Sequence, residues 1–161
     1  MEERIFRAAN GVSDSIVVPA RALMQAGTFG SVPAAAVVAL LARRRRLAAG
    51  LAVGGTAAWL LAKAAKPLGG RARPQGVLPD VRIREKIAGD LGWPSGHTAV
   101  ATTLALVAAP DLSAWARPVL AGAVLSTGFG RMYVGAHLPL DLAAGAGLGM
   151  MIASVVRRAG Y

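Results

Sequence analysis

The chain has 161 residues, enough for one domain but short for two. Hydrophobic residues make up 55% of it, the mean hydropathy is +0.50, and aromatic residues are only 5%. Ala, Leu, Val and Gly occur in long runs, a composition that favours membrane helices packed through small residues over a soluble domain. The absence of cysteine excludes disulfides, thiolate metal sites and cysteine nucleophiles.

The formal net charge is +10, which fits either nucleic acid or an anionic membrane surface as a partner. The basic residues lie in short gaps between apolar runs and form no stripe on a soluble face. This distribution favours membrane loops and phosphate handling, so we expect no nucleic-acid partner.

Residues 1–26 predict either an interfacial amphipathic helix or a first span from about Val12 to Ala26. Five apolar runs follow and predict spans at about residues 27–42, 47–65, 95–109, 114–129 and 138–156. The first run ends at Arg43–Arg46, which indicates a cytoplasmic loop, a nucleic-acid patch being the alternative. In the last run Gly145 and Gly149 stand four apart and predict a small-residue face for close helix contact.

One long polar stretch, residues 66–93, interrupts this pattern and predicts a loop with a short helix near residues 80–88. We interpret the basic cluster Arg82–Lys86 within it as solvated, contact with the substrate being the alternative. If the Arg43–Arg46 loop is inside the cell, counting spans places this stretch and residues 131–137 outside. The sequence therefore predicts one all-α domain over residues 1–161. It would be a multi-pass bundle of five to six helices in the plasma membrane.

Three polar segments hold nearly all of the side chains that can carry chemistry. They are Lys66–Pro74, Trp93–His97 and Arg131–Asp141. Lys66, Arg73 and Arg131 are long cationic side chains, and arginine can bind phosphate oxygens in bidentate fashion. By the span count above, all three segments lie at the same external face, where we expect these cations to bind a phosphate group.

The segment Pro94-Ser95-Gly96-His97 opens the helix predicted at residues 95–109. Ser95 is a natural N-cap, and the free backbone N–H groups of Gly96 and His97 would face an anion at the positive end of the helix dipole. Gly96 also lets the backbone approach a phosphate closely. We therefore expect Ser95 and Gly96 to bind phosphate together with the cations.

His137 and Asp141 lie four residues apart at the start of the last predicted span. A carboxylate held against one imidazole nitrogen fixes the tautomer and leaves the other nitrogen free to attack phosphorus. We expect His137 to be a nucleophile that forms a phosphohistidine, oriented by Asp141. His97 would then protonate the leaving alkoxide and later activate water.

Each of these residues also has a simpler explanation. Lys66 and Arg73 can be ordinary loop cations, and Ser95 can be an N-cap alone. His137 and Asp141 can form a helical hydrogen bond, or hold a metal ion that His97 completes. Three nearby cations would repel a divalent ion, however, and the simpler explanations together require three spaced motifs on one face by accident. Trp93 and Tyr133 are interpreted as interfacial anchors.

Taken together, the three motifs resemble the signature of the type 2 phosphatidic acid phosphatase family. They are Lys66-x6-Arg73-Pro74, Pro94-Ser95-Gly96-His97 and Arg131-x5-His137-x3-Asp141. That family comprises integral membrane lipid phosphatases and related soluble vanadium haloperoxidases and acid phosphatases. The resemblance covers residues 66–141 and implies a core of about six helices and metal-independent hydrolysis without a cofactor. It assigns the roles of phosphate ligand to Lys66, Arg73, Ser95, Gly96 and Arg131, acid to His97, nucleophile to His137, and orienting carboxylate to Asp141. One departure is Gly130, where the family usually has serine.

The resemblance, with a site at the membrane–water boundary, implies a substrate that has a phosphate head and a lipid tail. Phosphatidic acid, phosphatidylglycerophosphate, polyprenyl diphosphates and polyprenyl-linked sugar phosphates all qualify. The richness in Ala, Arg and Gly is typical of a high-GC bacterium, in particular an actinobacterium. In actinobacteria, small family members similar to this chain include enzymes of cell-wall biosynthesis that dephosphorylate decaprenylphosphoryl-5-phosphoribose. This lipid is the leading expected substrate. A polyprenyl diphosphate is the second expected substrate. Membrane lipids are the other expected partners, and a non-enzymatic anion transporter is the alternative outside enzymes.

Overall fold

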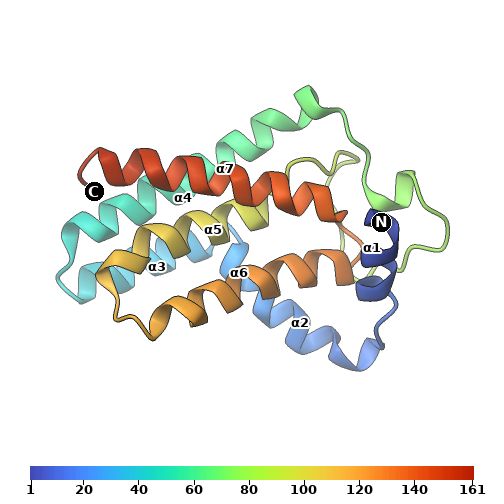
Figure 1. The fold of residues 1–161 in the computed structure, drawn as a ribbon, viewed down its shortest axis with the longest axis horizontal. Coiled ribbons are helices and arrows are strands. Elements are labelled where there is room, and N and C mark those ends of the chain that lie inside the picture. Colours follow the sequence, from blue (N-terminus) through green and yellow to red (C-terminus); the bar gives the residue numbers. More distant parts are fainter.

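Seven α-helices and no β-strand make up the computed structural model, which describes residues 1–161 (Figure 1). The helices are α1 (Glu2–Asn10), α2 (Val17–Met24), α3 (Ser31–Leu41), α4 (Arg45–Gly69), α5 (Gly96–Ala108), α6 (Ala116–Tyr133) and α7 (Pro139–Arg158). This confirms the all-α prediction. The five predicted spans correspond to α3 to α7, and the N-terminal 26 residues form two short helices in place of the single helix expected there.

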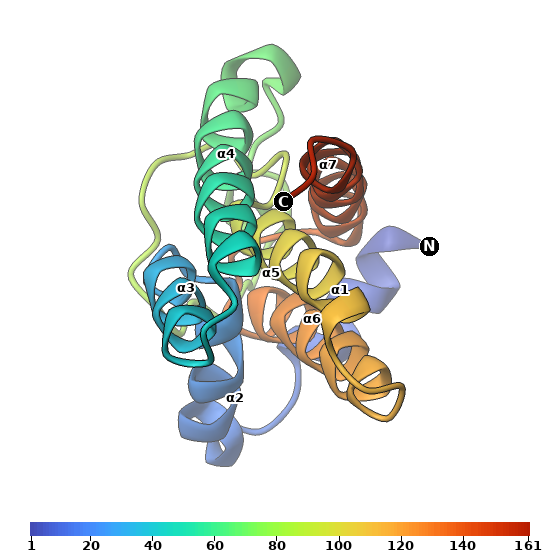
Figure 2. The same ribbon diagram turned by 90° about the vertical axis from the view of Figure 1, so that its left-hand side faces the viewer.

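Helix α5 lies at the centre of the bundle, between α4, α6 and α7 (Figure 2). Its Ala99, Val100 and Thr103 are completely buried, and the largest apolar cluster joins it to α3, α4 and α7. Because other helices surround it, α5 needs little apolar surface toward lipid and is only 13 residues long. The central position places the N-terminus of α5 at the end of the bundle where α4 and α6 end and α7 begins.

The contact between α5 and α7 depends on small residues, as the sequence predicted. A Cβ atom built on Gly149 would lie 2.7 Å from the backbone oxygen of Ala99, and one on Gly145 would clash with the backbone oxygen of Ser95. Since real Cβ atoms do not approach backbone oxygens so closely, the two glycines allow the helix axes to come together. Gly145 thereby places the start of α5 against the start of α7.

Two helices, α4 and α7, are long and apolar enough to cross a membrane, and a third span results if residues 14–41 are counted as one span bent by 66°. Neither α5 nor α6 meets this criterion by itself, although both coincide with predicted spans. Many large apolar side chains are exposed on the outer faces of α3, α4, α6 and α7, an arrangement that suits lipid contact. They include Val38, Leu41, Leu60, Leu61, Val119, Leu125, Met151 and Val155.

The loop between α4 and α5 differs from the expectation in three respects. It begins after Gly69, so Lys66 lies in the last turn of α4. Residues 80–88 form no helix, because Asp80 has a positive φ of 56° and the backbone N–H of Arg84 donates to Val134 at 3.1 Å. The Arg84 side chain is 6% exposed and not solvated. Arg82 and Lys86 of the same cluster are exposed, as expected, whereas Arg84 binds backbone oxygens of Asn10 and Tyr133.

Tyr133 was expected at the membrane interface, but it is completely buried. Its hydroxyl donates to the backbone oxygen of Ser13 at 3.0 Å, and the Arg84 guanidinium lies 4.2 Å from the centre of its ring. The Asn10 side chain donates to the backbone oxygens of Tyr133 and Arg82. The end of α1, the loop and the end of α6 are thus held together.

Replacement of Gly149 by valine tests the role of the small residues. Gly149→Val should lower the free energy of unfolding by about 1–3 kcal/mol or more, because the added side chain forces α5 and α7 apart. Gly147→Val is the matched control on the same helix, since a Cβ at Gly147 meets no atom within 4 Å. Thermal unfolding in detergent should show a clear loss for the first variant only. Equal melting temperatures would contradict this packing.

Candidate active site

The three polar segments come together at one end of the bundle, around a cavity of about 620 Å³. Its lining contains six of the eight predicted site residues, which come from α4, the following loop, α5, α6 and the segment before α7. They are Lys66, Arg73, Gly96, His97, Arg131 and His137. The same cavity is bordered by the apolar side chains of Phe29, Trp59 and Ile87. A polar group and an adjoining apolar chain can therefore be held together there.

Lys66 and Arg73 are bound mainly to backbone oxygens. The Lys66 ammonium donates to the carbonyls of Leu91, Gly92 and Pro94 at 3.1–3.4 Å. Arg73 uses Nε, Nη1 and Nη2 to donate to the carbonyls of Gly89, Ala136 and Ala88, at 2.8, 2.8 and 2.9 Å. A guanidinium has five N–H donors, so two remain available to a ligand. Arg73 also ties the loop to the segment that carries His137.

Arg131 is 4% exposed, and only one of its nitrogens has a partner, Nη1, which lies 3.2 Å from the Glu85 carboxylate. Its Nε is buried without a hydrogen bond. A buried, charged donor without a partner is costly, and an anion in the cavity would satisfy it. Arg131 is therefore the cation most clearly available to a ligand.

Ser95 is completely buried and does not line the cavity. Its Oγ accepts hydrogen bonds from the backbone N–H of Thr98 at 3.4 Å and from the Thr98 hydroxyl at 3.1 Å, so it caps α5. Its backbone N–H donates to the backbone oxygen of Asp141 at 2.9 Å. The structure thus shows Ser95 as the N-cap that aims the start of α5, with Gly96 and His97 presented to the cavity.

His137 is 3% exposed, and its Nδ1 lies 3.4 Å from Oδ2 of Asp141, a contact too long for a well-formed hydrogen bond. Burial lowers the pKa of His137 to about 4. Arg131 and Arg73 add to this effect, while the Asp141 carboxylate opposes it. Such an imidazole is neutral at physiological pH and keeps a lone pair for reaction.

Asp141 is completely buried and accepts a hydrogen bond from the backbone N–H of Leu138 at 2.9 Å, in the first turn of α7. Three further residues that support it were not predicted from the sequence. Arg71 donates to its Oδ1 at 3.1 Å, and Glu2 binds Arg71. Gly92 leaves room for the carboxylate, since a Cβ there would lie 2.8 Å from Oδ2. Only Arg71 had a sequence signal, as the extra cation within Lys66–Pro74.

Gly130, where the resembling family usually has serine, faces α2. A Cβ atom built on Gly130 would clash with Cγ of Met24 and lie 2.8 Å from its sulfur. Met24 is 2% exposed and belongs to the apolar cluster that includes Tyr133 and Val134. The methionine side chain therefore takes up the space beside Arg131 that a serine side chain would need.

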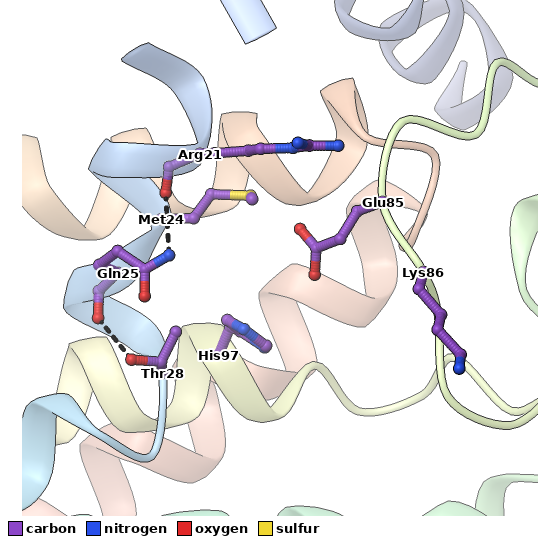
Figure 3. A pocket seen from close by; sticks show the side chains of 7 residues that line it. All are labelled: Arg21, Met24, Gln25, Thr28, Glu85, Lys86 and His97. Atoms are coloured by element: carbon purple, nitrogen blue, oxygen red, sulfur yellow. Dashed lines mark hydrogen bonds between the residues drawn. The ribbon is translucent and has the colours of Figure 1, made fainter. Parts of the chain in front are cut away.

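A second, smaller cavity of about 330 Å³ adjoins the first and shares His97, Glu85, Lys86 and Thr28 with it. Figure 3 shows Arg21 and Met24 of α2 and the adjoining Gln25 on one side of this cavity, the loop residues Glu85 and Lys86 on the other, and His97 between them. Met24 is the only apolar residue in its lining. His97 therefore stands between a cationic cavity with apolar borders and a polar cavity.

The helical bundle with apolar outer faces and a cationic cavity at one end defines an all-α integral membrane protein. Residues 46–161 match the PAP2 superfamily, so the chain belongs to that superfamily. It is 28% identical over 124 residues to an undecaprenyl-diphosphatase of Sulfolobus acidocaldarius, covering 75% of this chain but only 59% of that relative.

Two solved structures share the fold. Aquifex aeolicus LpxE has a TM-score of 0.88 at 22% identity, over 98% of this chain and 94% of that one. The PAP2-type phosphatidylglycerolphosphate phosphatase of Bacillus subtilis has a TM-score of 0.75 at 21% identity, over 97% and 82% of the two chains. The fold predicted from the motif pattern is thereby confirmed.

The protonation of His137 can be measured directly, since the chain has only two histidines. In NMR titrations of histidine-labelled protein, the His137 signal should have a midpoint near 4, below the ordinary value of about 6.5. His97→Asn removes the other signal and so assigns the pair. A His137 midpoint at or above the ordinary value would contradict its burial among cations.

A double-mutant cycle tests the contact between Gly130 and Met24. Gly130→Ser should destabilise the protein by about 1–3 kcal/mol because the side chain meets Met24. The same serine introduced together with Met24→Ala should cost much less, since the added atoms then have space. Thermal unfolding of the four proteins measures the coupling, and additive effects would show that Met24 does not respond to residue 130.

Proposed function

We propose that this protein is a membrane lipid phosphatase that hydrolyses a phosphate ester of a polyprenyl lipid or glycerolipid through a phosphohistidine. The observation that carries this proposal is the cavity in which Lys66, Arg73, Arg131, the start of α5 and both histidines converge. Membership of the PAP2 superfamily supports the same reaction class.

The phosphate would bind between the cations, with its non-bridging oxygens on Arg131 and the two free donors of Arg73. Lys66, whose three N–H groups donate to backbone carbonyls, would bind the phosphate through its positive charge. Backbone N–H groups at the start of α5 add to this binding. Charge spreads over these oxygens in the transition state, so the cations stabilise it.

His137 would attack phosphorus with the imidazole nitrogen not facing Asp141. The ester P–O bond breaks as the P–N bond forms, and His97 donates its proton to the leaving oxygen. The bound phosphate offsets the surrounding cations and allows His97 to carry that proton. In the second step His97 takes a proton from water, the resulting hydroxide attacks phosphorus, and the P–N bond breaks to release inorganic phosphate and His137.

The substrate proposed first is decaprenylphosphoryl-5-phosphoribose. In an in-line displacement the leaving group lies opposite the nucleophile, and His97, which would protonate it, also lines the smaller polar cavity. Gln25, Thr28 and Glu85 there offer hydrogen bonds to the hydroxyl groups of a sugar. The lipid tail would follow the apolar border of the larger cavity. A polyprenyl diphosphate is the second candidate, favoured by the name of the Sulfolobus relative.

We further propose that the site faces the outside of the cell, in the plasma membrane. Arg43–Arg46, at the turn from α3 to α4, and Arg157–Arg158, near the C-terminus, lie at the opposite end of the bundle (Figure 1). Clusters of arginine near membrane helices favour the cytoplasmic side.

The test is phosphate release by the purified protein from a panel of lipid monophosphates and diphosphates. His137→Asn should lower kcat by about 10⁴-fold or more while lipid phosphate still binds, as expected for loss of a nucleophile. Denatured wild-type protein should carry an acid-labile, base-stable phosphoryl group. The matched control is Arg157→Gln at the far end of α7, which should retain wild-type activity.

The other readings make different predictions. Activity that EDTA abolishes and a divalent ion restores would replace the phosphohistidine by a metal mechanism. A wild-type protein that releases no phosphate from any lipid but conducts anions in vesicles would be a transporter. Faster turnover of the diphosphates than of the sugar phosphate would select the second substrate.

A further inference from the structure

Arg71 lies two residues before Arg73 and bridges two carboxylates. Its Nη1 donates to Asp141 Oδ1 at 3.1 Å, and its Nη2 donates to Glu2 Oε2 at 2.5 Å. Arg71 lines neither of the two cavities described above, so it does not reach a phosphate bound there. Any effect of Arg71 on the reaction must therefore pass through Asp141.

Glu2, in the first turn of α1, makes two contacts with its carboxylate. One oxygen accepts from Arg71, and the other accepts from the backbone N–H of Leu140 at 2.8 Å. Burial acts to raise the pKa of Glu2, but the hydrogen bonds from Arg71 and Leu140 outweigh it and lower that pKa. An ionised Glu2 thus holds Arg71 and the first turn of α7, the turn that carries Asp141.

Asp141 needs this support because it is completely buried. A buried carboxylate stays ionised and fixed only when hydrogen bonds and charges compensate its lost hydration. Leu138 supplies one N–H to Oδ2, and Arg71 supplies the hydrogen bond to Oδ1. His137 Nδ1 lies nearest Oδ2. It therefore faces a carboxylate whose two oxygens are both held by hydrogen bonds.

We propose that Glu2 and Arg71 are positioning residues that fix Asp141, and through it His137, so that α1 is part of the catalytic unit. The proposal rests on the function proposed above, since it assigns the nucleophile to His137. Helix α1 lies outside the residues that match the superfamily, which begin at residue 46. In metal sites, loss of the group that orients a ligand typically costs about 10–100-fold in activity, and we expect an effect of similar size here.

Two variants and two matched controls test the proposal in the 161-residue chain. Arg71→Gln and Glu2→Ala should lower kcat by about 10–100-fold, with KM and inhibition by inorganic phosphate unchanged because the cavity keeps its cations. Arg82→Gln is the control in the same loop, and Glu3→Ala the control on α1. Glu3 pairs only with the exposed Arg7, so its loss should leave kcat unchanged.

The titration of His137 separates positioning from a general loss of stability. The charged groups that face His137 are Asp141, Arg131 and Arg73, with His97 nearby. Without the Arg71 guanidinium, the Asp141 charge acts more strongly on His137, so its NMR midpoint should rise in Arg71→Gln. Arg71→Lys, which keeps the charge, should restore part of both kcat and the midpoint.

A folded Arg71→Gln protein with wild-type kcat and an unmoved His137 midpoint would overturn the proposal. If that variant does not fold, Glu2→Ala decides by kcat, since a folded Glu2→Ala protein with wild-type kcat would also overturn the proposal. If the wild-type protein releases no phosphate, the function proposed above fails, and the His137 midpoint alone then shows whether Arg71 acts on Asp141.

Discussion

The structure depends most on how it gathers positive charge at one end of a largely apolar bundle. Lys66, Arg73 and Arg131 all line one cavity, and Glu85 is the only carboxylate in that lining. Like charges brought together away from water repel strongly. Six hydrogen bonds to backbone carbonyls compensate this repulsion, three donated by Lys66 and three by Arg73. The loop therefore follows a course set by the cations, and residual repulsion favours entry of an anion.

The helices and the meeting of the three segments were predictable from the sequence, for two separate reasons. Apolar runs of sufficient length indicate helices, and an even number of crossings returns the chain to the same side. The contact of His137 with Asp141 was predictable from their spacing, but the support from Glu2 and Gly92 was not, because nothing local relates these residues to Asp141. Glu2 and Leu140 are 138 positions apart, and Glu2 by itself looks like an ordinary acidic residue in the first turn of a helix.

Within the basic cluster of the loop, charge alone predicted the environment of Arg84 wrongly, whereas Arg82 and Lys86 are exposed as expected. Arg84 is a charged residue in a basic loop segment, which favours a solvated position. Its side chain nevertheless donates to the backbone oxygens of Asn10, Val12 and Tyr133. The last carbonyls of a helix have no partner within the helix, and the end of α6 is buried here. The Arg84 guanidinium, from a distant loop, binds the carbonyl of Tyr133 at the end of α6 and that of Asn10 at the end of α1. The need for a hydrogen-bond donor at these carbonyls arises from tertiary packing, so no local sequence pattern indicates it.

The N-terminal region, which lacks any of the three motifs, completes the site in three places. Glu2 reaches Arg71, Asn10 binds the end of α6, and Met24 packs against Gly130 beside Arg131. The departure at Gly130 has a structural counterpart in this region, since the Met24 side chain occupies the space that a serine would take. Substitutions in the N-terminal region therefore constrain those that the motif segments can accept, and the reverse also holds. The motif residues supply the chemical groups, and the geometry of those groups also depends on helices that the motif pattern does not include.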